Sequence, residues 1–111
     1  MAKPDVLGGF ELLVLLAVMR LGEHAYGVPI ADTIEEASGR DIAAGSIYIT
    51  LDRLEAKGLV ASRLGESTPE RGGRAKTYFQ MTGKGVRAVR HAQRTLVTLW
   101  SGVPHLQGGA V

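Results

Sequence analysis

The order of elements between residues 27 and 81 constrains the fold of this chain more than any other feature of its sequence. Two helical segments are followed by two strand-like segments, LVASRL at residues 59–64 and TYFQ at residues 77–80, and the loop between the strands is rich in Arg and Gly. Small domains with this order present one helix to the major groove of duplex DNA and a cationic hairpin to its backbone. We therefore predict a mainly α-helical fold with a small β-hairpin, organised as a winged helix-turn-helix that binds duplex DNA.

Turn and cap residues predict the limits of the two helices. Pro29 suits the first turn of a helix that opens at residue 27, because a missing N–H costs nothing there, and Gly39 is the expected end of that helix. The next helix is predicted to start near Gly45 or Ser46, with Ser46 as its N-cap, and to end at Gly58.

The second of these helices is the expected reading helix. Apolar residues at the spacing of one helical face predict which side is buried, and the opposite side then faces outward. Arg53 on the outward side is the candidate for base recognition, because a bidentate Arg discriminates guanine by about 1–3 kcal/mol. Its alternative role is a surface ion pair with Asp52, Glu55 or Glu70. The predicted DNA-contacting residues of this helix are Ser46, Tyr48, Ile49, Thr50 and Arg53.

The hairpin and its loop carry the expected contacts to the DNA backbone. Residues 1–52 have three basic and eight acidic side chains, whereas residues 53–111 have ten basic and three acidic ones. A chain polarised in this way can turn a positive face toward a polyanion. The Tyr48 hydroxyl is a further candidate for a phosphate contact, with packing of its ring beside the preceding helix as the alternative. The predicted contacts of the hairpin are Arg63, Arg71, Arg74 and Lys76.

The first and last helices are predicted to form a dimer interface. The segment from Leu7 to Leu21 is apolar on all sides, so it needs more cover than one small domain supplies. A long helix is expected after Thr82, its predicted N-cap, and its apolar seam at three- and four-residue steps suits a partner helix. We expect residues 7–81 to form the DNA-binding domain, 82–104 the dimerisation helix and 105–111 a flexible tail. The predicted interface residues are Phe10, Leu13, Val14, Val89, Leu96 and Trp100.

Composition favours no other class of function. The chain has no Cys and its three His residues are isolated, so we expect no disulfide and no metal site. The apolar segment at residues 10–21 is shorter than the about 20 residues of a transmembrane helix, and the first residues lack the pattern of a secretory signal. No arrangement of nucleophile and base is evident. We expect a cytoplasmic protein that is not an enzyme and needs no cofactor.

The residues also match the pattern of a known family. Over roughly residues 7–95 the chain closely resembles PadR-like transcriptional regulators, through Tyr26-Gly27, Gly45-Ser46-Ile47-Tyr48, Leu51, Arg53-Leu54-Glu55, Gly58-Leu59, Gly73-Arg74, Lys76, Tyr78 and Met81-Thr82. The resemblance implies a winged helix-turn-helix, a homodimer formed by the first and last helices, and usually repression. Many relatives have Pro and a basic residue where this chain has Ile49 and Asp52. We therefore expect a different operator, in which Ile49 touches a thymine methyl group.

Two interpretations of Trp100 and two of the whole chain stay open. Trp100 is either an anchor of the dimer interface or, as in some compact relatives of the family, a ring that stacks on a flat ligand. The second role predicts a small aromatic effector bound by Val14, Leu96 and Trp100. The alternative for the chain is a winged-helix protein-protein interaction module without DNA binding, although such a module has no need of a cationic hairpin.

Overall fold

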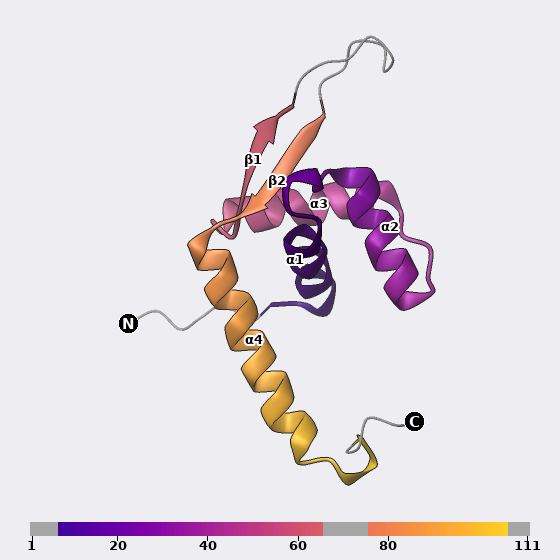
Figure 1. Cartoon of the computed structure of the whole chain (residues 1–111), viewed down its shortest axis with the longest axis vertical. Helices are drawn as coiled ribbons and strands as arrows, with labels where there is room; N and C mark the ends of the chain where they lie inside the picture. Colours follow the sequence, from indigo (N-terminus) through magenta and orange to yellow (C-terminus); the bar gives the residue numbers. More distant parts are fainter. Residues whose placement is uncertain (1–6, 66–75, 107–111) are drawn as a thin grey trace.

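The computed structural model describes residues 7–65 and 76–106, and these form a mainly helical chain with a two-stranded hairpin (Figure 1). The predicted fold class is confirmed. In chain order the elements are α1 (Gly9–Leu21), the 3-10 turn η1 (Gly22–His24), α2 (Gly27–Ser38), α3 (Ala44–Ala56), β1 (Val60–Leu64), β2 (Thr77–Met81), α4 (Gly83–Ser101) and the 3-10 turn η3 (Pro104–Leu106). No helix within these two ranges has the length and apolar character needed to cross a membrane.

The turn between α2 and α3 confirms one predicted limit and corrects another. α2 ends at Gly39, which adopts φ 72° and donates its N–H to the Glu35 carbonyl oxygen at 2.8 Å. The N-cap of α3 is Ala43 and not Ser46, because the Glu35 carboxylate holds the turn by accepting the Ile42 N–H at 2.7 Å. The Ser46 N–H already belongs to the helix and donates to the Ala43 carbonyl oxygen at 3.0 Å.

α1 lies at the centre of the fold, with α2, α3 and the hairpin around it (Figure 1). Its side chains Val14, Leu15 and Val18 are buried together with Ile30 of α2 and Leu51 of α3. Each helix contributes apolar residues at the spacing of one helical face, so all of them share one core. The core fixes the orientation of α3 relative to α2. One face of α3, the proposed reading helix, is thereby left on the surface of the molecule.

The hairpin is anchored on the helix pair through its second strand. β1 and β2 pair antiparallel along their whole length. Tyr78 of β2 also forms a single β-bridge with Tyr26, and the Phe79 N–H donates to the Ala25 carbonyl oxygen at 2.8 Å. Because Ala25 and Tyr26 directly precede α2, the middle of β2 is joined to the start of that helix.

α4 begins as predicted and then leaves the body of the molecule. The hydroxyl oxygen of its N-cap Thr82 accepts the Gly85 N–H at 3.0 Å, and a Cβ on Gly85 would collide with the Leu59 carbonyl oxygen. Beyond Val89 the helix extends away from the core (Figure 1), and apart from Ala92 its residues are exposed. The turn η3 includes the first residues of the segment expected to be a flexible tail, and residues 107–111 lie outside the described ranges.

A buried carboxylate ties α1 to the end of α3. Glu11, 7% exposed, accepts the Gly8 N–H at 2.9 Å and forms an ion pair with Lys57 Nζ at 2.9 Å. Burial by itself would raise the pKa of Glu11, but the two hydrogen bonds and the charges of Lys57 and Arg53 hold this pKa below its ordinary value of 4.5. The charged carboxylate therefore stabilises the folded chain.

Replacing Glu11 by Gln should reduce the free energy of unfolding at pH 7 by about 1–3 kcal/mol, because a charge-assisted hydrogen bond and an ion pair are weakened. A carboxyl group with a lowered pKa stabilises the fold above its unfolded-state pKa and loses this contribution as the pH falls. The difference between wild type and Glu11→Gln should thus shrink below about pH 4.5. Urea unfolding from pH 7 to pH 3 measures it. The exposed Glu23→Gln is the control, and equal effects of both substitutions at pH 7 would contradict the prediction.

Candidate nucleic-acid interface

α3 presents one exposed face next to the hairpin. Its inner residues Ile47, Leu51 and Leu54 have no exposed surface, which fixes the rotation of the helix about its own axis. At about 100° per residue the opposite side must then face solvent. The exposed residues on that side are Ser46, Ile49, Asp52 and Arg53. The structure therefore groups most of the residues predicted to read DNA on one surface.

Thr50 does not belong to this surface. Its side chain is only 5% exposed, because residue 50 follows the outward Ile49 by one helical step toward the buried side. The prediction that Thr50 contacts DNA is wrong for this conformation. The sequence placed it on a flank of the outward face, and that flank is buried in the structure.

Within the described residues, Arg53 forms no ion pair with the acidic residues predicted as its alternative partners. Glu55, one of its predicted alternative partners, instead accepts hydrogen bonds from the Ser62 N–H at 3.1 Å and the Ser62 hydroxyl at 2.6 Å. Within residues 7–65 and 76–106 the recorded ion pair is that of Lys57 and Glu11. Glu70, the remaining alternative, lies outside the described residues. The Arg53 side chain is exposed, and its charge also acts on the Glu11 carboxylate.

Tyr48 has features of both predicted roles. Its ring lies against the start of α2, where a Cβ on Gly27 would collide with the Tyr48 hydroxyl and lie 2.6 Å from Cζ. The side chain is nevertheless 46% exposed. Gly27 is needed at this position because it leaves room for the ring, and this contact connects the reading helix to the first turn of α2.

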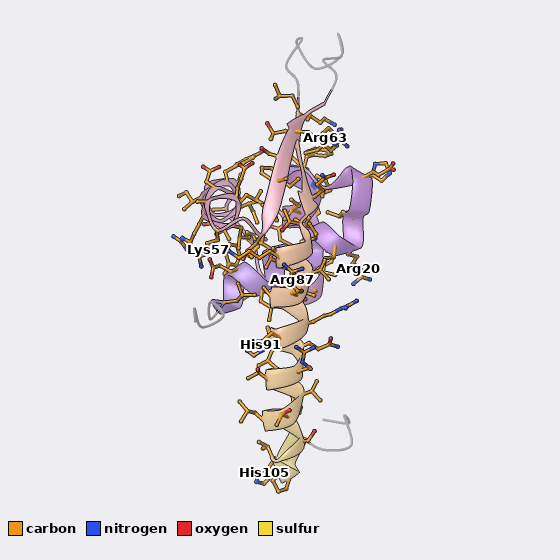
Figure 2. The ribbon with its side chains drawn as sticks, turned by 90° about the vertical axis from the view of Figure 1, so that its left-hand side faces the viewer. Arg20, Lys57, Arg63, Arg87, His91 and His105 are labelled. Carbon is orange, nitrogen blue, oxygen red and sulfur yellow. The ribbon has the colours of Figure 1, made fainter. Side chains whose placement is uncertain are left out.

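The described cations of the hairpin lie over tyrosine rings. The Lys76 ammonium is 4.0 Å from the centroid of the Tyr26 ring, and the Arg63 guanidinium carbon is 4.7 Å from that of Tyr78. The two rings meet edge to face, with centroids 5.3 Å apart and an interplanar angle of 63°. Figure 2 shows Arg63 at the hairpin, above the helical body. The remaining predicted hairpin contacts, Arg71 and Arg74, lie outside the described residues.

Sequence reasoning missed the part that Tyr26 and Tyr78 play in this group. Both residues belonged to the family pattern, but they are far apart in the chain and nothing in their spacing indicates a contact. A prediction that residues 25–26 pair with the second strand would have placed Tyr26 next to Tyr78. Cations above aromatic rings attract the electron-rich ring faces, so these four side chains hold one another in place.

The predicted dimer residues fall into two groups. Val14, with no exposed surface, and Val89, 6% exposed, belong to the core of the single chain, so their assignment to an interface is wrong, as is the assignment of Val14 to an effector site. An apolar seam predicts a contact but does not say whether the same chain supplies the other side. Leu13, Leu96 and Trp100 are exposed, and Phe10 is half-buried against the core.

An apolar groove lies between α1 and α2. Its volume is about 680 Å³, and it is lined mainly by Leu13, Leu16, Ala17 and Met19 of α1 and by Ile34 and Ala37 of α2. α4 carries a second row of exposed apolar residues, including Leu96, Val97, Leu99 and Trp100. Two apolar surfaces on one small chain are typical of a protein that associates with a partner.

The described residues offer no metal centre. No group of three or more His, Cys, Asp or Glu side chains in residues 7–65 and 76–106 is arranged to hold a metal ion. Figure 2 shows His91 on α4 and His105 in the following turn, each separate from the exposed face of α3.

Comparison with known proteins gives a consistent result. The model of the transcriptional regulator PadR-like family matches residues 15–91, which is more than half of the chain. A comparison with curated protein sequences gave no match. A solved PadR family transcriptional regulator from Eggerthella lenta DSM 2243 is 30% identical, covers 88% of this chain and 83% of its own, and superimposes with a TM-score of 0.68.

Two further solved structures share the fold at lower identity. A PadR family transcription regulator from Clostridium difficile R20291 is 22% identical over 91% of this chain and 100% of its own, with a TM-score of 0.73. A PadR-like transcriptional regulator from Bacillus cereus strain ATCC 14579 is 22% identical over 91% of this chain and 93% of its own, with a TM-score of 0.71.

Proposed function

This chain belongs to the PadR-like family of transcriptional regulators, and on that premise we propose that it is a cytoplasmic repressor that binds a pseudo-palindromic operator as a homodimer. The family implies regulation of transcription through DNA binding and not enzymatic catalysis. The sign of regulation, the dimer and the site residues are our proposal.

The exposed face of α3 carries the proposal. The inner side of this helix is fully buried, and its outer side presents Ser46, Ile49 and Arg53 next to a basic hairpin. Such a helix is suited to enter a major groove. Arg53 then reads guanine, Ile49 lies against a thymine methyl group, and Ser46 and Tyr48 bind phosphate. Asp52 repels phosphate but accepts a hydrogen bond from the amino group of cytosine.

A dimer accounts for the two exposed apolar surfaces of the chain. The outer side of α1, with Leu13 and the groove beside it, and the exposed side of α4, with Leu96 and Trp100, supply complementary apolar area. A twofold dimer places two reading helices in successive major grooves. Their half-sites are then about 10 bp apart, centre to centre, or a multiple of this distance.

A gel-shift titration of genomic DNA fragments at two salt concentrations tests the proposed function. We expect retarded fragments at low salt and much weaker binding at high salt, because phosphate contacts release counterions. Retardation of no fragment at either salt concentration would contradict the proposed function and favour the alternative of a protein-interaction module.

Replacing Arg53 by Ala should weaken binding to the selected operator by about 1–3 kcal/mol and leave binding to unrelated DNA almost unchanged. The loss reflects a base contact, which unrelated sequences do not provide in the same position. Fluorescence anisotropy with both DNAs measures the two affinities. The control is Arg87→Ala, an exposed cation on α4 and not on the reading helix. Equal losses on operator and unrelated DNA would assign Arg53 to phosphate instead.

The proposed effector is a planar aromatic molecule that stacks on Trp100. Trp100 is 55% exposed and Leu96 is 45% exposed, so both are available between two subunits, whereas Val14 is not. Because Trp100 is the single Trp of the chain, stacking should quench its fluorescence. A titration with planar dyes and hydrophobic phenolics should show quenching together with release of operator. Quenching without release would mean that the ligand does not favour a dimer with misaligned reading helices.

A further inference from the structure

Three consecutive residues connect the hairpin to the reading helix. The Ala25 carbonyl oxygen accepts the Phe79 N–H of β2, Tyr26 forms a β-bridge with Tyr78, and Gly27 receives the ring of Tyr48 from α3. The two DNA-facing elements of the proposed function thus meet at one short segment before α2. This segment therefore links the position of the hairpin to that of the reading helix.

Side chains reinforce this junction on the hairpin side. Lys76, Tyr26, Tyr78 and Arg63 form a continuous series in which each cation lies over a ring and the rings meet edge to face. Gly65, at the end of β1, leaves the space for the Tyr78 ring, since a Cβ there would collide with that ring. We call the four residues Arg63, Tyr78, Tyr26 and Lys76 the tyrosine brace.

The brace orders two cations that remain accessible to solvent. Its cations lie at the loop end of the paired strands, where Arg63 is exposed and Lys76 is half-buried, so a ring holds each charge without removing it from solvent. A long cationic side chain that is already ordered loses less conformational freedom when it binds phosphate. Ordered cations at a fixed angle to α3 are what simultaneous contact with groove and backbone requires.

We propose that Tyr26 and Tyr78 are positioning residues for DNA binding: they hold Lys76 and Arg63 and fix the hairpin relative to α3, so that both elements engage one duplex. This inference rests on the proposed DNA-binding function. It assigns to the brace a role in affinity and salt dependence, beyond its role in folding.

The test uses the full chain and its selected operator, with Tyr26→Leu, Tyr26→Phe, Lys76→Met and the double variant Tyr26→Leu/Lys76→Met. Fluorescence anisotropy at several salt concentrations gives the dissociation constant and its salt slope, and thermal unfolding is followed separately. Tyr26→Leu should raise the dissociation constant about three- to tenfold and lower the salt slope by about one, and Lys76→Met should act alike. Tyr26→Phe, which keeps the ring, should stay within about twofold of wild type.

The double variant tests whether the two residues act together. If Tyr26 works through Lys76, the double variant should bind no more weakly than the weaker-binding single variant, because both substitutions remove the same positioned charge.

Several outcomes would overturn the inference or the function on which it rests. Fully additive losses of binding free energy in the double variant would overturn the inference. So would a Tyr26→Leu variant that has a lower melting temperature but binds DNA with the wild-type salt slope. Equal losses in the Leu and Phe variants would indicate a direct contact of the hydroxyl and would also overturn it. If Tyr26→Leu fails to fold, a wild-type slope in Lys76→Met decides against the brace. Failure of the wild type itself to bind DNA is a different result, which refutes the proposed function.

Discussion

Replacing Leu96 by Asp should convert the proposed homodimer into monomers and weaken operator binding by about 10²- to 10⁴-fold, which is the gain that a second linked half-site provides. Leu96 is 45% exposed and lies on the part of α4 beyond the core, so the monomer should stay folded. A carboxylate at this position would be buried without a partner in an apolar interface. Light scattering at micromolar concentration should report twice 11.8 kDa for the wild type and the monomer mass of 11.8 kDa for the variant.

Thr98→Asp is the matched control for this prediction. Thr98 is exposed on the same turn of α4, but two residues rotate the side chain by about 200°, so it lies on the far side of the helix from Leu96. Thr98→Asp should remain dimeric and bind operator like the wild type. A well-folded wild-type monomer at micromolar concentration, or an unchanged mass for Leu96→Asp, would contradict the proposed role of the exposed face of α4.

Neutralising the hairpin by replacing Arg71, Arg74 and Lys76 with Ala should weaken binding to all DNA sequences and lower the salt slope by about two to three. The reason is the loss of about one counterion released per phosphate contact, independent of base sequence. Anisotropy titrations at a series of salt concentrations give the slope. An unchanged slope would mean that the hairpin does not touch the DNA.

Neutralising three cations on α4 tests whether the effect belongs to the hairpin. Arg87, Arg90 and Arg94 are exposed, and the part of α4 that carries them extends away from the hairpin (Figure 1). Their replacement removes the same total charge. It should change the slope much less, because phosphate contacts act at short range and distant charges are screened within about 10 Å at 0.1 M salt. Equal effects of the two triple variants would indicate a general charge effect.

Local chemistry predicted most of the fold. Pro29 and Gly39 mark α2 because their backbone preferences are intrinsic, and Thr82 caps α4 through a hydroxyl three residues from its target N–H. The start of α3 was misplaced because Glu35 holds the turn from the preceding helix. A turn that is held by a side chain of another element cannot be predicted from the residues beside the turn.

The site was predicted less completely than the fold. Helical spacing identified the outward face of α3 with Ile49 and Arg53, but it placed Thr50 there too, because the width of a buried face depends on how many elements cover it. The same limitation explains Val14 and Val89, whose apolar seam faces the core of their own chain. The brace depends on a contact between Tyr26 and Tyr78 that only the tertiary fold creates.

A nuclease footprint of the wild-type protein on its selected operator tests the central claim most directly. The account predicts two protected half-sites related by a dyad, with centres about 10 bp or a multiple of this distance apart, because each subunit places one α3 helix in a major groove. A single protected half-site would contradict the proposed dimeric reading of DNA. Protection without sequence preference would contradict the assignment of base recognition to α3.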